Sequence, residues 1–480
     1  MQKIDNYIDG ELVAPIDDAY LDNVNPATGQ VYALTPDSDQ KDVQRAVDAA
    51  KAAFSAWSSC GIETRARLLD KIADLIDENI DILARAESID NGKPLSLARN
   101  VDIPRASANF RFYASGIQHF ASESHYMEGL AINYTQRTPI GVAGCISPWN
   151  LPLYLFSWKI APALAAGNTV VAKPTEVAPM TAYLLSKICI DAGLPKGVLN
   201  IVHGFGHKVG QAIVAHEDIP VISFTGGTET GKKIATTAAP MFKKMSLELG
   251  GKNPNIIFAD CDFDEMLKTT LRSSFANQGQ ICLCGSRIFV ERPIYEKFKM
   301  AFVSKVQKMK VGDPLDEQTR MGAVVSETHM NKVLGYIQLA QQEGGTVLAG
   351  GQRVIVDGDC AEGYFIAPTV IEGLHANCRT NQEEIFGPVV TMMPFDTEDE
   401  VLQMANATPY GLAATVWTQD LKRAHKFSHQ LKSAIVWVNC WLLRDLRTPF
   451  GGMKQSGMGR EGGFEALRFF TEPQNICIKL

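Results

Sequence analysis

Apolar residues recur at every third or fourth position through the first quarter of the chain. This spacing predicts amphipathic helices over residues 40–57 and 64–87, and largely helical structure from 40 to 118. From residue 139 onward the pattern changes, because short β-rich runs such as TVVAKP, LNIVHG and VISFTGG each precede a helical pattern. Alternation of strands and helices along a chain is typical of a parallel, doubly wound sheet.

A second alternating region begins at residue 253 and continues to residue 440. The pair Gly250–Gly251 lies between the two regions and marks the expected boundary between two doubly wound parallel-sheet (Rossmann-like) domains. Two extended segments lie outside both regions, and such outlying strands often pair between subunits. The predicted α/β architecture is therefore residues 1–118 with 139–250 as one domain, 251–450 as the second, and 119–138 with 466–480 as outlying strands.

The composition argues against several classes of function. The chain has 480 residues and a net charge of -7, so it has no overall positive field that would attract nucleic acid or an anionic membrane. The apolar stretch 141–167 contains three prolines and Lys159, which predicts a strand, a turn and a buried helix rather than a membrane span. Ten cysteines without regular spacing, and without a secretory signal before them, are typical of a reduced, cytoplasmic protein that holds no metal.

Two turns carry residues that suit a nucleotide. The run FTGGTETG joins a strand to a helix through Gly226, Gly227 and Gly231, and such a turn presents backbone N–H groups to a phosphate. Lys173 and Glu176 follow another strand, where a carboxylate suits ribose hydroxyls and repels a 2′-phosphate, which favours NAD over NADP. Taken singly, the first pattern is also typical of an ordinary strand–helix turn, and the second of a solvated ion pair.

Two further segments carry candidate catalytic groups. Glu248 ends an apolar run before two glycines, and a carboxylate with restricted solvation has a raised pKa and can serve as a general base. The alternative is a surface glutamate beside a turn. Cys282 follows a small polar loop in FANQGQICLC, and a thiolate is a good nucleophile for a carbonyl carbon. Cys284 competes for this role, and either thiol could equally be a small buried side chain.

Together these segments resemble the aldehyde dehydrogenase superfamily. The resemblance rests on an ordered set of motifs that spans nearly the whole chain: PWN (148–150), KPTE (173–176), FTGGTETG (224–231), ELGGK (248–252), FANQGQIC (275–282), EEIFGP (383–388) and PFGGMKQSGMGRE (449–461). Each motif alone is modest, but the ordered set is highly specific. The resemblance implies NAD-dependent oxidation of an aldehyde to a carboxylic acid. It also implies that residues 1–118 with 139–250 bind NAD and that 251–450 are catalytic. The outlying strands 119–138 and 466–480 would form a small β oligomerisation bridge, and the protein would be a homodimer or homotetramer.

The resemblance also assigns roles to the catalytic candidates. Cys282 matches the nucleophile, which favours it over Cys284, and it would pass through a thiohemiacetal and a thioester. Glu248 matches the base that activates water. The side-chain amide of Asn150 and the backbone N–H of Cys282 match the groups that stabilise the oxyanion.

For the cofactor, Lys173 and Glu176 match adenosine-ribose contacts, and Glu384 and Phe386 match contacts with the nicotinamide ribose and ring. Trp149 is expected nearby, and Gly226, Gly227 and Gly231 are expected at the phosphates. The chain departs from the family pattern at Gly227, where relatives usually have serine. This departure removes one hydroxyl donor while leaving the backbone contacts in place.

Two arginines narrow the expected substrate. Arg105 and Arg444 fall where relatives line the substrate tunnel, and many of those relatives have apolar or aromatic residues there. Guanidinium groups bind carboxylates bidentately, so we expect a conjugated, small-molecule semialdehyde with a carboxylate at its far end. The alternative is that both arginines lie at the surface in ion pairs, for example with Asp102 or Asp445. Two other arginines could take the role instead, Arg111 and Arg447.

Three other functions compete with this hypothesis. A broad aliphatic or betaine aldehyde dehydrogenase is one, although a trimethylammonium group favours an aromatic cage over arginines. Acylation of coenzyme A is another, but the relatives with that activity generally lack the glutamate that matches Glu248. A catalytically silent, crystallin-like structural protein is the third, and the intact set of Cys282, Glu248 and Asn150 argues against it.

Overall fold

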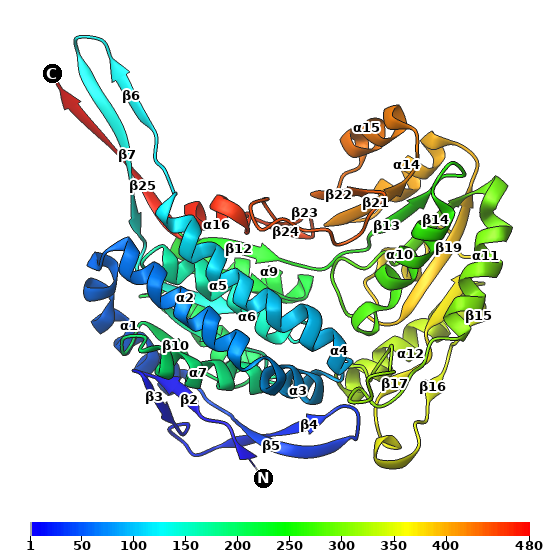
Figure 1. Cartoon of the computed structure of the whole chain (residues 1–480), viewed down its shortest axis with the longest axis horizontal. Coiled ribbons are helices and arrows are strands. Elements are labelled where there is room, and N and C mark those ends of the chain that lie inside the picture. Colours follow the sequence, from blue (N-terminus) through cyan, green and yellow to red (C-terminus); the bar gives the residue numbers. More distant parts are fainter. Residues whose placement is uncertain (1) are drawn as a thin grey trace.

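The computed structural model describes residues 2–480, which form two α/β units and a projecting β arm (Figure 1). The first unit is built on an eight-stranded sheet with the order β24-β12-β11-β8-β9-β10-β2-β3. Its five central strands are parallel, and the order reverses at β8 (Val142–Ile146), which lies between β11 and β9. The other strands are β2 (Asn6–Ile8), β3 (Glu11–Val13), β9 (Thr169–Lys173), β10 (Leu199–Ile201), β11 (Val221–Thr225), β12 (Lys244–Glu248) and β24 (Gly457–Met458).

This topology fixes where a ligand binds in the first unit. In doubly wound sheets, ligands bind outside the carboxyl ends of the strands at the point where the strand order reverses. In this chain that point lies beyond Ile146 of β8 and Thr225 of β11, which are followed by the PWN and Gly226–Gly227 segments. The fold therefore brings two of the predicted cofactor motifs to one crevice.

The first unit is covered by helices whose apolar faces pack on the sheet. In α1 (Gln40–Ser59), buried Val43, Ala46 and Ala50 follow the predicted spacing, and Asp39 caps the helix with a reciprocal hydrogen bond to Asp42. The helix predicted over 64–87 is two helices in the structure. The helices are α2 (Ile62–Glu78), α3 (Ile80–Asn91), α4 (Leu95–Leu97), α5 (Ile103–Gln118), α6 (Pro152–Ala165), α7 (Met180–Ala192), α8 (Gln211–Ala215) and α9 (Thr228–Ala238).

The second unit contains a seven-stranded sheet with the order β15-β18-β19-β14-β13-β21-β22. Every pair in it is parallel except β15 with β18, which are antiparallel at one edge. The predicted α/β fold with two doubly wound sheets is thus confirmed. The strands are β13 (Pro254–Ile257), β14 (Arg287–Glu291), β15 (Thr346–Ala349), β18 (Thr369–Glu372), β19 (Val389–Phe395), β21 (Ala413–Trp417) and β22 (Ile435–Val438). The main helices are α10 (Phe263–Phe275), α11 (Arg292–Gln307), α12 (Glu327–Gln342), α14 (Glu398–Asn406) and α15 (Leu421–Gln430).

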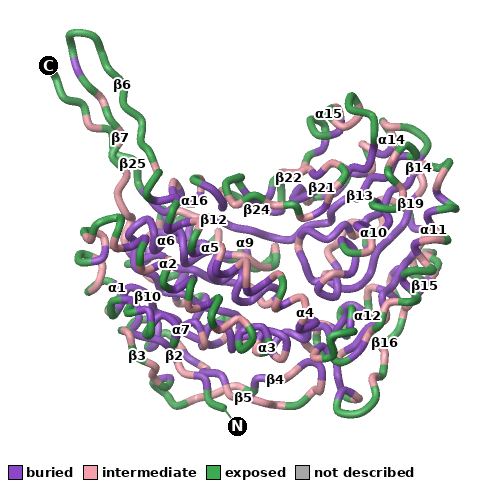
Figure 2. The backbone as a smooth tube through the Cα atoms, in the orientation of Figure 1, coloured by how far each residue is buried: buried purple, intermediate pink, exposed green. Residues whose placement is uncertain are grey.

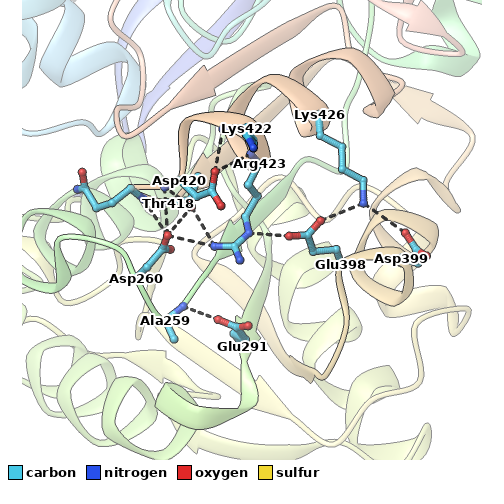
Figure 3. Close-up of polar contacts among 11 residues, drawn as sticks. Ala259, Asp260, Glu291, Glu398, Asp399, Thr418, Asp420, Lys422, Arg423 and Lys426 are labelled. Atoms are coloured by element: carbon cyan, nitrogen blue, oxygen red, sulfur yellow. Dashed lines mark hydrogen bonds and ion pairs between the residues drawn. The ribbon is translucent and has the colours of Figure 1, made fainter.

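A polar network fastens α14 and α15 beyond the ends of β13 and β21 (Figure 3). Arg423 donates to Asp260 at 3.1 Å and to Glu398 at 2.8 Å, and Lys426 pairs with Glu398 at 2.9 Å. Asp260 also accepts from the hydroxyl of Thr418 at 2.9 Å. Charged partners with several hydrogen bonds hold their segments more rigidly than isolated surface pairs do. Thr418 also forms two hydrogen bonds with Asn439, where the loop that carries Arg444 begins.

The arm is a three-stranded antiparallel sheet with the order β25-β7-β6. It consists of β6 (Ser124–Met127), β7 (Ala131–Pro139) and β25 (Thr471–Lys479), and it projects from the first unit with most of its residues exposed (Figure 2). The extended segment expected from residue 466 starts later, at Thr471. Residues before it form α16 (Gly463–Phe469), because Ala466 and Leu467 pack into the core of the first unit.

Among residues 2–480, no helix has both the length and the apolar character that a membrane crossing requires. The described part of the chain also contains no group of three or more His, Cys, Asp or Glu side chains placed to hold a metal ion. All ten cysteines are free thiols.

Candidate active site

Two adjoining cavities meet at Cys282. The residue follows a turn in which Asn277 and Gln278 adopt left-handed conformations, with φ of 51° and 57°, and the turn directs the chain between the two units. Cys282 lines both cavities, whereas Cys284 is buried and lines neither of them. The fold therefore separates two thiols that the sequence pattern left equivalent.

The surroundings of Cys282 hold its thiol in the neutral form in this structure. Burial raises the pKa of the thiol above its ordinary value, and the carboxylates of Glu384 and Glu248 raise it further, while Arg444 acts in the opposite direction. Its backbone is fixed as well, because Asn253 Nδ2 donates to the Cys282 carbonyl at 2.7 Å and to the Cys284 carbonyl at 2.9 Å. A thiol placed in this way needs added positive charge, or loss of a proton to a base, before it can attack.

Asn150 lies beside this thiol on the loop after β8. Its Nδ2 donates to the Gln280 carbonyl at 2.9 Å, and a carboxamide has a second N–H that can serve a ligand. The Asn150 carbonyl accepts from Lys93 Nζ at 3.1 Å and from Asn277 Nδ2 at 2.8 Å. Lys93 is itself buried and paired with Asp102 at 2.5 Å, so the peptide that carries the amide is rigidly held.

Glu248 ends β12 with its side chain buried. Neither of its carboxylate oxygens has a hydrogen-bond partner among residues 2–480, and both are shielded from solvent. Burial raises the pKa of Glu248 well above its usual range, and the neighbouring charge of Glu461 raises it further. Glu461 is bound by Lys159 at 2.9 Å and by Ser223 at 2.7 Å. A raised pKa makes an unpartnered buried carboxylate a stronger base than an ordinary glutamate, so it suits the removal of a proton from water.

The first cavity contains both predicted substrate arginines. Arg444 Cζ lies 4.7 Å from the Trp158 ring centre and 4.5 Å from that of Phe450, and its guanidinium donates to the Tyr154 hydroxyl. Arg105 Cζ lies 5.5 Å from the ring centre of Tyr154. The arginines thus lie against an aromatic wall, and Cys282 and Glu248 line the same cavity.

The alternative ion pairs do not form. Asp102 pairs with Lys93, and Asp445 pairs with Arg447 at 2.5 Å. The other candidate, Arg111, binds Asp74 and Asp77 on the surface. Among residues 2–480, neither Arg105 nor Arg444 has an acidic side chain within 4.0 Å, so neither arginine forms an ion pair.

The second cavity has the character of a nucleotide site. It is lined by Pro148, Trp149, Asn150, Thr225, Gly226, Gly227, Leu249, Gly250, Cys282, His329, Lys332, Glu384 and Phe386. Gly227 precedes α9, and a Cβ there would meet nothing within 4 Å, so the backbone at the helix N-terminus is open to a phosphate. A Cβ on Gly250 would lie 2.4 Å from Glu384 Oε2, so glycine is required for Glu384 to approach, and its Oε1 accepts from the Gly251 N–H at 2.9 Å.

Three predicted cofactor residues lie outside the lining of this cavity. Lys173 and Glu176 form an ion pair of 2.8 Å at the end of β9, the strand next to β8. Their position suits the far end of a ligand that extends along the strand ends. Gly231 lies within α9, where a Cβ would come 2.5 Å from Leu249 Cδ2. This glycine therefore allows the helix to pack closely against Leu249.

Comparison with known proteins identifies the chain. Residues 13–476 match the model of the aldehyde dehydrogenase family. The chain belongs to this family. It is 50% identical to the 2-aminomuconic semialdehyde dehydrogenase of Mus musculus, over 99% of this chain and 98% of the relative. It is 46% identical to the 2-hydroxymuconic semialdehyde dehydrogenase of Pseudomonas sp. (strain CF600), over 100% of both chains. The NAD⁺ complex of an aldehyde dehydrogenase from Bacillus cereus has a TM-score of 0.97 and 41% identity, and the match covers 100% of this chain and 97% of that one.

The protein is therefore an NAD-dependent aldehyde-oxidising enzyme, as the motifs predicted. The second cavity fits the cofactor, because it combines an open helix N-terminus with the carboxylate of Glu384 and the aromatic faces of Trp149 and Phe386. Cys282 lies where this second cavity meets the cavity of the two arginines. Ligands held in the two cavities would therefore meet at this thiol.

Sequence reasoning missed three basic residues that line the cavities of this aldehyde dehydrogenase. His329 Nε2 lies 2.7 Å from the Phe386 carbonyl, its ring centre lies 5.0 Å from that of Trp149, and burial lowers its pKa to about 4. Lys332 lies one turn further along α12 and lines the second cavity with it. Arg272, at the end of α10, lines the cavity of the two arginines. The only available signal was the polar pair His329 and Lys332 at helical spacing, which is common on any solvated helix.

Proposed function

We propose that Cys282, Asn150 and Glu248 carry the reaction of this aldehyde dehydrogenase. The Cys282 thiolate attacks the aldehyde carbon, and the carbonyl oxygen becomes an oxyanion that accepts from Asn150 Nδ2 and the Cys282 backbone N–H. When bound, NAD supplies the acceptor for the hydride that leaves this carbon. Loss of the hydride turns the thiohemiacetal into a thioester on Cys282. Glu248 then takes a proton from water, and the hydroxide attacks the thioester carbon. The C–S bond breaks, the sulfur takes the proton back from Glu248, and the carboxylic acid leaves with the thiol and the Glu248 carboxylate restored.

We propose a conjugated semialdehyde with a distal carboxylate as the substrate, with 2-aminomuconic 6-semialdehyde as the first candidate. The observation that carries this proposal is the pair of arginines in the substrate cavity that have no acidic partner. A buried or half-buried guanidinium without a counter-ion is costly, and a substrate carboxylate would compensate it with bidentate hydrogen bonds. Names of the relatives support the same chemistry, and they keep 2-hydroxymuconic semialdehyde as the second candidate.

The test compares Arg444→Met and Arg105→Met with a matched control, Arg447→Met. Arg447 lies on the same loop as Arg444, but it is exposed and bound to Asp445. The assay measures NADH formation with 2-aminomuconic, 2-hydroxymuconic, betaine and simple aliphatic aldehydes. Loss of a charged hydrogen bond costs ~1.5–3 kcal/mol, so kcat/KM for the muconic substrates should fall about 10- to 150-fold in each cavity variant.

The selectivity of this loss decides the proposal. Simple aldehydes should keep their kcat/KM within a few fold in both cavity variants, and Arg447→Met should behave like the wild type with every substrate. Equal losses for muconic and simple aldehydes would contradict the carboxylate subsite. Losses in Arg447→Met as large as those in Arg444→Met would contradict it as well, since they would reflect a general disturbance of the loop.

We also propose that the arm pairs subunits in a homodimer or homotetramer. It exposes several large apolar side chains, and exposed apolar surfaces of this kind are typical of contact sites. They are Tyr126, Met127, Leu130, Ile132, Tyr134 and Ile478.

A reduced, cytoplasmic location is consistent with the ten free cysteines.

A further inference from the structure

The loop that carries Arg444 is held in an unfavourable conformation by contacts with distant residues. It begins at Asn439 and includes Leu442, and both are left-handed, with φ of 54° and 58°. Non-glycine residues adopt this conformation at a cost, and they persist only where the surrounding structure holds them. Asn439 is fixed at the base of the loop by two hydrogen bonds with Thr418, which belongs to the polar network of Figure 3.

Two tryptophans hold the rest of this loop through their indole N–H groups. Trp437 Nε1 donates to the Leu443 carbonyl at 3.0 Å, so this bond ties β22 to the residue before Arg444. Trp441 Nε1 donates to the Leu283 carbonyl at 2.9 Å, and Leu283 is the residue after Cys282. Trp441 is 2% exposed, and its own carbonyl accepts from Arg272 Nη2 at 3.1 Å.

The nucleophile segment is therefore held from two sides. Asn253 binds the carbonyls of Cys282 and Cys284, and Trp441 binds the carbonyl of Leu283 between them. Residues 281–284 form a turn in which the Cys284 N–H donates to the Ile281 carbonyl at 2.9 Å, so the Cys282 and Leu283 carbonyls are left for partners from other segments. Asn253 follows the ELGGK turn that ends the base-carrying segment, whereas Trp441 belongs to the loop of the carboxylate subsite. Loss of the Trp441 bond would leave the Leu283 carbonyl without this support, next to the thiol.

We propose that Trp441 is a positioning residue for Cys282, which acts by tying the Arg444 loop to the backbone of the nucleophile segment. This inference rests on the proposed function only for the role of Cys282 as nucleophile. Trp441 also lines the cavity of the two arginines, but its indole N–H is bonded to the Leu283 backbone, and this bond is the same whichever aldehyde is oxidised. Its loss should therefore lower the rate of attack on every aldehyde.

The test compares Trp441→Phe with Trp437→Phe. Both variants replace an indole that holds a loop carbonyl or belongs to the loop by a smaller ring without a donor, but only the Trp441 indole is hydrogen-bonded to the nucleophile segment. A displacement of about 1 Å in a reacting group can cost about 100-fold in rate, so we expect Trp441→Phe to lower the NADH burst rate about 10- to 100-fold with simple and carboxylated aldehydes alike. The rate at which iodoacetamide alkylates Cys282 in the NAD-bound enzyme should differ from that of the wild type by a similar factor. This rate is measured by mass spectrometry of the peptide that contains Cys282.

Trp437→Phe should leave the alkylation of Cys282 and the burst with simple aldehydes within about twofold of the wild type. To separate the lost donor from the lost ring volume, Trp441 alone is also replaced by 3-benzothienylalanine, which has the shape of tryptophan but no N–H. This replacement should reproduce the loss, and it keeps the test valid if Trp441→Phe fails to fold.

Three results would overturn the inference. One is wild-type alkylation and burst rates in a folded Trp441 variant. Another is an equal loss in the Trp437 and Trp441 variants, which would indicate general loosening of the loop. The third is wild-type behaviour of the benzothienyl protein. Failure of the substrate proposal would look different, because Arg444→Met would then lack selectivity while the Trp441 variants kept their uniform loss.

Discussion

Replacing Asn150 with alanine should separate catalysis from stability in this enzyme. The lost side chain donates to the Gln280 carbonyl at 2.9 Å, but that carbonyl also accepts from Asn277 at 3.2 Å and so keeps a partner. The bonds from Lys93 and Asn277 end on the backbone carbonyl of residue 150, which alanine retains. We therefore expect a loss of only about 1 kcal/mol in the free energy of unfolding, the typical value for one hydrogen bond.

The effect of the same change on the reaction should be much larger. Removal of one oxyanion donor typically lowers the rate ~10²–10³-fold, or ~2.7–4 kcal/mol in activation free energy. The assay is the stopped-flow NADH burst at saturating NAD and aldehyde, with denaturant unfolding of the same preparation. Asn150→Asp is the informative companion, because it would set a carboxylate against the Gln280 carbonyl and should lower both rate and stability. A burst within about threefold of the wild type in folded Asn150→Ala would refute the role of this amide.

Two further predictions concern the base and the cofactor turn. Glu461→Gln removes a charge that raises the pKa of Glu248, so the base stays deprotonated to lower pH and the acid limb of the pH profile of thioester hydrolysis should move to lower pH. Lys159→Met removes a charge that lowers this pKa, so it should move the acid limb to higher pH. Shifts in the reverse directions would contradict the electrostatic argument. Gly227→Ser places a hydroxyl in open space before α9. One added hydrogen bond should lower the dissociation constant of NAD about 2- to 10-fold, as measured by titration calorimetry. Weaker binding would contradict the expected phosphate contact.

Local patterns predicted the elements of this aldehyde dehydrogenase well where burial is one-sided. The spacing of Val43, Ala46 and Ala50 marked α1, and the β-rich runs before helices marked the parallel strands. The prediction was less accurate at element ends. A single periodic run over 64–87 became two helices that meet at Asn79, and α16 occupies residues expected to be extended. Periodicity reports which face is buried, but it does not report where the chain changes direction.

The candidate site divides in the same way. The ordered motifs were sufficient to identify the family and to nominate Cys282, Glu248 and Asn150, because each motif encodes a local strand, turn or loop. The pattern could not find His329, Lys332 or Arg272, which enter the cavities from helices without any motif. It also gave no sign that Trp441 is hydrogen-bonded to the nucleophile segment.

The motifs and their order were enough to predict the fold class, the family and the chemistry of the chain. The partners and the surroundings of each charged group became known from the folded structure alone. Arg105 and Arg111 lie on the same helix, yet one faces the substrate cavity and the other is neutralised by Asp74 and Asp77. The physical reason is that the state of a charged group depends on its desolvation and its partners, and these are supplied by segments far away in the chain.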